Sequence, residues 1–148
     1  MKIVRASIDD ATEIQQCVAA AYEHYIPRMG KAPGPMLDDY PLRIAQNEVY
    51  IIKDAGEVVA LLVLIITPDQ YLLDNIAVRP DQQGRGLGKQ LMAFAVQRAV
   101  EMGHDAIDLY THEVMTENIA MYSKWGYVET QRINVKGYDR IYMRKTIR

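Results

Sequence analysis

Residues 74–88 read DNIAVRPDQQGRGLG, and this stretch decides the fold. It opens inside an apolar, β-branched segment that begins at Tyr71 and is typical of a strand. Three glycines, Gly84, Gly86 and Gly88, follow, and the residues after them carry apolar side chains at helical spacing. We therefore predict a strand that runs through a glycine-rich turn into a helix.

The predicted turn is suited to hold a phosphate group. The first backbone N–H groups of a helix have no partner inside the helix. Glycines let the backbone adopt positive φ and approach a pyrophosphate closely, and the helix dipole adds about half a positive charge. Arg85 and Lys89 can add whole charges. The alternative interpretation of the same glycines is a plain tight turn.

Two familiar phosphate-binding motifs do not fit this turn. A nucleotide P-loop needs Ser or Thr after Gly-Lys, whereas Gln90 follows Lys89 and has no hydroxyl for Mg²⁺. A dinucleotide fingerprint spaces its glycines as Gly-x-Gly-x-x-Gly after the first strand of a parallel sheet. Here the glycines occupy alternate positions and follow strands joined by short turns, so this fingerprint is excluded as well.

The segments around the turn predict a mixed sheet. Three strands over 49–52, 57–66 and 71–78 are joined by short connections and are expected to form an antiparallel meander. The helix after the glycines leads to a strand over 106–110, which is expected to lie parallel to the strand before the turn. Two strands near the C-terminus are expected to form a closing hairpin.

The N-terminal third is predicted to be helical. A first helix has apolar residues at Ile14, Val18 and Tyr22 and is expected to stop near Pro27. A loop with two glycines and two prolines follows, and a second helix is expected over 36–46.

Composition indicates a soluble, single-domain protein spanning 1–148. Apolar residues make up 49% and charged residues 24%, and the net charge is −2, which gives no support for binding to nucleic acid or to a membrane. The only cysteine, Cys17, excludes an internal disulfide and favours a cytoplasmic location. The three histidines show no ligand spacing, so no metal site is expected.

Two motifs resemble those of the GNAT superfamily of acetyl-coenzyme A-dependent N-acetyltransferases. The first is Gln83-x-x-Gly86-x-Gly88, which is similar to the family's Gln/Arg-x-x-Gly-x-Gly/Ala pyrophosphate motif. The second is NIAMYSKWGY, residues 118–127. It resembles a family segment that contains an asparagine, an alanine and a tyrosine and ends in the pattern Tyr-x-x-x-Gly-Phe/Tyr. In that segment the tyrosine lies beside the coenzyme sulfur.

The resemblance implies an α/β GNAT fold, in which a mixed, mostly antiparallel sheet is flanked by helices and splayed between its fourth and fifth strands. Acetyl-CoA is the cosubstrate and occupies that gap, and main-chain groups of Ile76 and Val78 bind it like an added strand. The residues that the resemblance implies for coenzyme binding are Ile76, Ala77, Val78, Gln83, Gly84, Arg85, Gly86, Leu87, Gly88, Lys89, Asn118 and Tyr122.

Two side chains are candidates for the chemistry. An amine of pKa about 10.4 must lose a proton before it attacks, and a carboxylate can take that proton. Asp74 is the candidate base, and strand alternation is expected to place it on the face of Ile76 and Val78, opposite Asn75. From the resemblance, Tyr122 is the candidate acid that protonates the departing coenzyme thiolate.

Each candidate has a structural alternative. Asp74 can cap a turn or pair with an arginine, and Tyr122 can simply pack in the core. Glu113 and Glu117 are further candidates for the base, and the alternative for Glu117 is to serve the first turn of its helix. Other residues that can line an acceptor site, or serve only packing and solvation, are Asp38, Asp39, Tyr22, Tyr25 and Tyr40.

The expected function is transfer of the acetyl group from acetyl-CoA to an amine of a small molecule or peptide, by direct attack in a ternary complex. A non-catalytic acyl-CoA sensor and an enzyme that acetylates protein N-termini or lysines are the alternatives. Residues 28–41 are long enough to fold over the site, which favours small acceptors. Exposed strand edges allow a homodimer.

Overall fold

The computed structural model describes residues 1–147 and is built around one seven-stranded sheet. The strand order is β1-β2-β3-β4-β5-β7-β6, and the β4–β5 pair is parallel while the other pairs of the described chain are antiparallel. The strands are β1 (Ile3–Arg5), β2 (Val49–Asp54), β3 (Glu57–Ile66), β4 (Tyr71–Val78), β5 (Ala106–His112), β6 (Val128–Val135) and β7 (Tyr138–Thr146).

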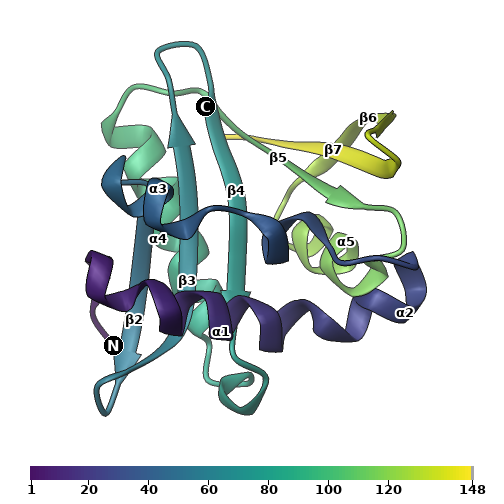
Figure 1. Ribbon diagram of the computed structural model, residues 1–148. Helices are drawn as coiled ribbons and strands as arrows, with labels where there is room; N and C mark the ends of the chain where they lie inside the picture. Colours follow the sequence, from purple (N-terminus) through teal and green to yellow (C-terminus); the bar gives the residue numbers. More distant parts are fainter. Residues whose placement is uncertain (148) are drawn as a thin grey trace.

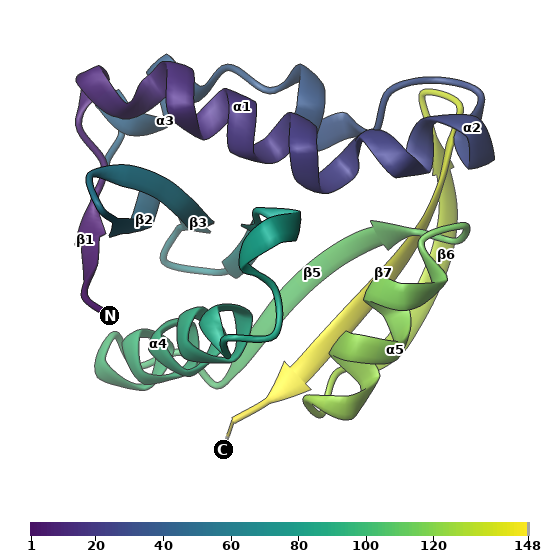
Figure 2. The ribbon, with the colours of Figure 1, turned by 90° about the horizontal axis from the view of Figure 1, so that it is seen from below.

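Helices cover both faces of this sheet, as Figures 1 and 2 show. On one face lie α1 and α3, and on the other lies α4, with α5 beside β5 and β7. The helices are α1 (Ala11–Tyr22), α2 (Ile26–Met29), α3 (Tyr40–Ala45), α4 (Leu87–Glu101) and α5 (Thr116–Lys124), with short 3₁₀ turns η1 (Ile8–Asp10), η2 (Glu23–Tyr25), η3 (Gly34–Leu37) and η4 (Pro80–Gln82). The mixed, mostly antiparallel α/β fold expected from the sequence is confirmed.

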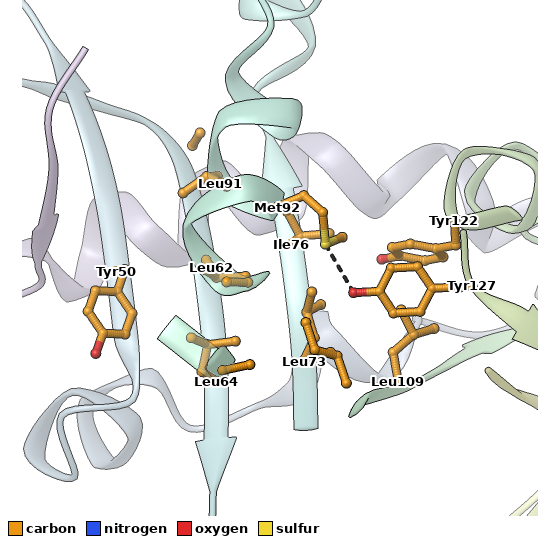
Figure 3. Packing of buried hydrophobic residues seen from close by; sticks show 14 of the residues in the cluster. Tyr50, Leu62, Leu64, Leu73, Ile76, Leu91, Met92, Leu109, Tyr122 and Tyr127 are labelled. Atoms are coloured by element: carbon orange, nitrogen blue, oxygen red, sulfur yellow. Dashed lines mark hydrogen bonds between the residues drawn. The ribbon is translucent and has the colours of Figure 1, made fainter. Parts of the chain in front are cut away.

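The central strand β3 explains why the sheet needs helices on both sides. Its residues from Val58 to Leu64 are all buried, so the strand is apolar on both faces. Leu62 and Leu64 pack with Leu91 of α4, as Figure 3 shows, whereas Leu61 packs on the side of α1. A continuous apolar run therefore forms a strand between two separate hydrophobic layers.

Strands β4 and β5 separate soon after they meet. Their pairing is limited to Leu72 opposite Asp108, and β5 continues as a neighbour of β7 from Ala106 to His112. Figure 2 shows β5 and β7 running away from the first half of the sheet. The expected splay between the fourth and fifth strands is confirmed, and the main-chain groups of β4 beyond Leu72 have no strand partner on that side.

A bulge changes the direction of side chains in β4. Val63 pairs with Asn75 and Leu64 pairs with Leu73, so Asp74 is an extra residue with no counterpart in β3. An extra residue of this kind interrupts the alternation of side chains between the two faces.

The prediction that Asp74 shares a face with Ile76 was wrong because of this bulge. Ile76 packs in the layer beneath α4, as expected. Asp74 and its neighbour Asn75 both lie on the α1 and α3 side, where Asp74 lines a cavity with Tyr22 and Asn75 binds the Tyr22 hydroxyl.

Prolines shape the N-terminal helices differently from the expectation. Pro27 does not end a helix but lies in the first turn of α2, where its missing N–H costs no hydrogen bond. The helix expected over 36–46 is instead η3 followed by α3. Pro41 fits only the first turn of α3, and Asp39 before it caps the helix by accepting a hydrogen bond from the Leu42 N–H at 3.1 Å.

A buried polar chain ties these N-terminal segments to β4. The Tyr22 hydroxyl has one proton, and two acceptors share it: Asn75 Oδ1 at 2.7 Å and the Ile76 carbonyl at 3.1 Å. Asn75 Nδ2 donates to the Tyr40 hydroxyl at 3.0 Å, which in turn donates to the Pro35 carbonyl at 2.5 Å. Because these groups are buried, each lost partner carries the cost of an unsatisfied polar atom.

This chain predicts the effect of Tyr40→Phe. The variant removes the acceptor of Asn75 and the donor to Pro35, so the free energy of unfolding should fall by about 1–3 kcal/mol. Tyr50→Phe is the matched control, because Tyr50 is also buried but its hydroxyl makes no hydrogen bond within residues 1–147. Denaturant titration of both variants checks this, and equal losses would contradict a role for the polar chain.

Candidate active site

The glycine turn presents a row of backbone donors. Gly86 has φ 77° and immediately precedes α4, which starts at Leu87, two residues earlier than expected. The first N–H of this helix that is bonded internally is that of Gln90, which donates to the Gly86 carbonyl at 2.9 Å. In the described chain, no acceptor is found for the N–H groups of residues 84–89. Such a row at a helix start binds anions.

A cleft of about 550 Å³ lies between this turn, the end of α1, β4 and α5. A Cβ added to Gly88 would lie 3.6 Å from the Trp125 ring and 3.7 Å from Val78, which are ordinary van der Waals distances, so Gly88 lies against α5 and the end of β4. Most of the sequence-predicted coenzyme residues line the cleft: Ile76, Ala77, Val78, Gln83, Gly84, Gly86, Leu87, Gly88, Lys89 and Asn118.

Arg85 is not brought to this cleft. Its guanidinium pairs with Asp54 at 2.8 Å and binds Gln82 Oε1 at 2.5 Å, on the side of the turn that faces the β2–β3 end. Lys89 does line the cleft, and its ammonium group makes no ion pair within residues 1–147. The cationic side chain available to an anion in the cleft is therefore Lys89.

A second cavity, of about 290 Å³, opens on the α1 and α3 side of the splayed strands. Tyr22 and Asn118 line both cavities, so the two meet at these side chains. Its walls come from the N-terminal segments, β4, β5, α5 and β7. The polar or aromatic residues among them are Tyr22, Asp38, Arg43, Asp74, Tyr110, Thr111, His112, Asn118, Tyr122, Tyr138 and Arg140.

Asp74 is a half-buried carboxylate in this second cavity. It accepts no hydrogen bond and forms no ion pair with any of residues 1–147. Burial raises the pKa of Asp74 above its ordinary value; Arg43 and Arg140 act against this rise, and Asp38 adds to it. The expected pairing with an arginine is not found, because Arg43 is held by Asp38 at 3.1 Å and by Glu48 at 3.2 Å.

Tyr122 reaches the same cavity from α5. Its ring packs edge-on against Trp125 and Tyr127, with centroids 6.4 and 5.8 Å away. Figure 3 shows its hydroxyl pointing away from α5 toward β4. Burial raises the pKa of Tyr122, with a further contribution from Tyr25, so the hydroxyl stays protonated at neutral pH. No hydrogen-bond partner for it is found in the described part of the chain.

The other acidic candidates are engaged elsewhere. Arg28 donates to Glu117 at 2.6 Å, and this bond lowers the pKa of the Glu117 carboxyl to about 2. Glu113 does not line either cavity and faces Arg132 at 3.9 Å. The structure thus leaves Asp74 as the unpaired carboxylate of the second cavity, with Asp38 tied to Arg43.

Sequence reasoning missed several polar residues of this cavity, among them Tyr110 and Arg140. Tyr110 follows the alternation of β5, in which Leu109 points into the core, and this alternation was a usable signal. No pattern in the sequence connects Arg140 to the site, because β7 approaches it only through the tertiary fold.

A family model described as the acetyltransferase (GNAT) family matches residues 13–127. The chain belongs to this family. The curated "Uncharacterized N-acetyltransferase YvbK" of Bacillus subtilis is 30% identical over 93 residues, which cover 62% of this chain and 58% of that protein. "Mycothiol acetyltransferase" of Clavibacter sepedonicus is 30% identical over 122 residues, covering 78% of this chain and 39% of that protein. The chain thus spans well under two thirds of the length of these GNAT relatives.

The fold is shared with solved GNAT structures. The PaiA N-acetyltransferase of Thermoplasma acidophilum, solved in complex with coenzyme A, has a TM-score of 0.72 at 18% identity, with 98% of each chain covered. Within residues 1–147 of this GNAT chain, no cluster of three or more His, Cys, Asp or Glu side chains suited to a metal ion is found. The same residues contain no helix long and apolar enough to cross a membrane.

The glycine turn of this GNAT protein predicts the effect of Gly86→Val. Nothing lies within 4 Å of an added Cβ, so the cost comes from the positive φ of 77° and is about 1–3 kcal/mol. That strain displaces the N–H row, and acetyl-CoA binding should weaken at least about tenfold through lost charge-assisted hydrogen bonds.

Gly56→Val provides the matched control. Gly56 has φ 80° and equally open space, but it lies in the β2–β3 turn. Calorimetric titration with acetyl-CoA should show weaker binding for Gly86→Val alone, although both variants lose stability. Unchanged binding by Gly86→Val would mean that the turn does not hold the pyrophosphate.

Proposed function

We propose that this protein transfers the acetyl group of acetyl-CoA to the amine of a small acceptor, by direct attack within a ternary complex. The observation that carries the proposal is the junction of two cavities at Tyr22 and Asn118, where an anion-binding cleft meets a chamber that contains an unpaired carboxylate. Family membership agrees with the reaction type.

The cleft has the features that acetyl-CoA requires. The N–H groups of residues 84–89 and the Lys89 ammonium suit the pyrophosphate. The unpaired edge of β4 at Ile76 and Val78 suits the amide-containing pantetheine, which can add to it like a strand. The Ile76 carbonyl already accepts the Tyr22 hydroxyl at 3.1 Å, so we assign the pantetheine contacts to the remaining main-chain groups of these residues.

Asp74 is suited to act as the base. The attacking amine, with a pKa of about 10.4 in the case of a lysine-like group, arrives mostly protonated at neutral pH. A proton of the ammonium group first passes to Asp74, directly or through one water, and the nitrogen lone pair then forms a bond to the thioester carbonyl carbon. The raised pKa of the Asp74 carboxyl makes it a better proton acceptor than an ordinary aspartate.

Tyr122 is suited to assist the departure of the coenzyme. The carbon–sulfur bond breaks as the intermediate collapses, and coenzyme A leaves as a thiolate. The Tyr122 hydroxyl, which is protonated at neutral pH and has no partner in the described chain, can donate a hydrogen bond and then a proton to that sulfur.

The covering of the second cavity favours a small acceptor over a folded polypeptide. The Tyr138 hydroxyl donates to the Ala32 carbonyl at 2.8 Å, and Lys31 donates to the Gly137 carbonyl at 2.7 Å. These bonds fasten the segment before η3 to the β6–β7 turn. The cavity volume of about 290 Å³ is just below the usual range of ligand pockets, about 300–1,000 Å³.

The proposal also includes a cytoplasmic location and a homodimer. Cys17 is buried and unpaired, which suits a reducing cytoplasm. Strand β6 is the edge of the sheet, and Val128 and Ile133 on it are exposed, which gives a second copy of the chain a place to pair as a homodimer.

The proposal is tested by the release of free thiol from acetyl-CoA across a panel of small amines and N-terminal peptides, alongside calorimetric binding of acetyl-CoA. Turnover of small amines supports it. Tight binding without turnover of any amine would indicate an acyl-CoA sensor, and turnover restricted to peptides would indicate a protein acetyltransferase.

Tyr122→Phe should leave acetyl-CoA binding unchanged and lower kcat by about a hundredfold, because only the hydroxyl is removed. Tyr127→Phe is the matched control, since its hydroxyl contacts Met92 in the core, outside both cavities. Steady-state kinetics and coenzyme titration separate the two effects. Equal kcat for Tyr122→Phe and the parent would remove Tyr122 from the reaction.

Asp74→Asn should lower activity yet stabilise the protein at neutral pH. Because burial raises the pKa of Asp74 above 3.8, its ionised form costs stability at a pH above the folded-state pKa, and that cost vanishes as the pH falls below 3.8. The Tm advantage of Asp74→Asn should therefore be present at pH 7 and shrink in acid. The charged or titratable groups that line the same cavity or interact with Asp74 are Asp38, Arg43, Glu48, Arg140, His112, Tyr22, Tyr40, Tyr110, Tyr122 and Tyr138.

The same variant should lose about 10²–10⁴-fold in kcat/KM and the acidic limb of the parent's pH profile. Asp69→Asn, in the exposed β3–β4 turn, is the control and should change neither property. A Tm gain without a loss of activity would contradict the assignment of Asp74 as the base.

A further inference from the structure

The second cavity contains an arginine that has no acidic partner. Arg140 of β7 lines it, half-buried, with its guanidinium 4.0 Å from the centre of the Tyr110 ring. The guanidinium donates one hydrogen bond, to the Tyr142 hydroxyl at 3.4 Å. Among residues 1–147 no carboxylate forms an ion pair with it, in contrast to Arg43, which is shared by Asp38 and Glu48.

Asp74 and Arg140 therefore form a separated pair of opposite charges in one chamber. Each is close enough to influence the other, since Arg140 opposes the rise in the pKa of Asp74, yet they do not form an ion pair. Charges that are partly removed from water are normally paired, because desolvation costs free energy that only a partner offsets. Two unpaired charges of opposite sign facing one cavity indicate a ligand that carries the complementary charges.

The shape of the chamber limits the size of that ligand. A volume of about 290 Å³ accommodates a small molecule with a short side chain rather than a peptide. The lining of the chamber also includes the apolar side chains Met29, Leu37 and Met115. The Arg140 guanidinium lies over the Tyr110 ring and makes one hydrogen bond, to Tyr142, so its other N–H groups remain for a carboxylate.

We propose that the acetyl acceptor is a free amino acid, with its amine at Asp74 and its carboxylate at Arg140. The inference rests on the proposed function, because it names the substrate class of the same site. Asp38 and Arg43 form an ion pair with each other in the wall of the chamber, and Glu48 binds Arg43 as well, so neither Asp38 nor Arg43 is without a partner as Asp74 and Arg140 are. The acceptor is chosen by its two charges together, and a simple amine satisfies only one of them.

The test compares each common L-amino acid with its carboxamide, which keeps the amine and removes the negative charge. Thiol release from acetyl-CoA should show kcat/KM at least about tenfold higher for the preferred acid than for its amide. Arg140→Gln should raise KM for the acid about tenfold or more, and leave KM for the amide and the binding of acetyl-CoA unchanged. Because Arg140 also lowers the pKa of Asp74, the two proteins are compared on the pH plateau of each. Arg140→Lys should restore part of the loss.

Arg132→Gln is the matched control, because Arg132 on β6 is exposed, lies outside both cavities and pairs with Glu129 at 3.0 Å. It should behave like the parent. Amides used as well as acids by the parent, or an equal loss of both by Arg140→Gln, would overturn the inference while leaving the acetyltransferase proposal intact.

A binding measurement separates the inference from catalysis. In the presence of coenzyme A, the preferred amino acid should raise the Tm of the protein more than its amide does, and Arg140→Gln should abolish the difference. Such binding without any thiol release would support the amino-acid site and refute the acetyltransferase proposal. Thiol release with simple amines but no carboxylate-dependent Tm shift would support the acetyltransferase proposal and refute the amino-acid site.

Discussion

The separation of β4 from β5 is the constraint on which the rest of this structure depends. The two strands pair only at Leu72 and Asp108, after which β5 follows β7. Backbone groups inside a sheet are normally paired, so an unpaired edge in the middle of the molecule needs another partner. Tyr22 takes one of these groups, the Ile76 carbonyl, and the others border the cleft.

Both cavities follow from this separation. On one side the glycine turn places its N–H row at the opening, because α4 begins where β4 ends. On the other side the bulge at Asp74 directs a carboxylate toward the N-terminal helices rather than toward α4. A one-residue insertion in a strand thus moves a charged group from a hydrophobic layer into a chamber that it shares with Tyr122.

The N-terminal segments complete the chamber, and both hydrophobic packing against the sheet and buried polar contacts hold them there. Asn75 links Tyr22 and Tyr40, and the β6–β7 turn binds the segment near Ala32. These contacts join parts of the chain that are far apart in sequence, so the acceptor side of the site exists only in the complete fold. The cleft beside the glycine turn depends mainly on residues that are close together in the sequence.

The sequence by itself determined the strand, turn and helix over 71–102, the antiparallel meander and the family resemblance. These depend on local glycine geometry, apolar periodicity and short connections, which act between neighbouring residues. It also identified Tyr122 and most of the cleft residues, because they lie within two continuous motifs. Only the tertiary structure decided the direction of Asp74, the engagement of Arg85 by Asp54 and the approach of Arg140, since a bulge register and contacts between distant strands leave no periodic signal in the chain.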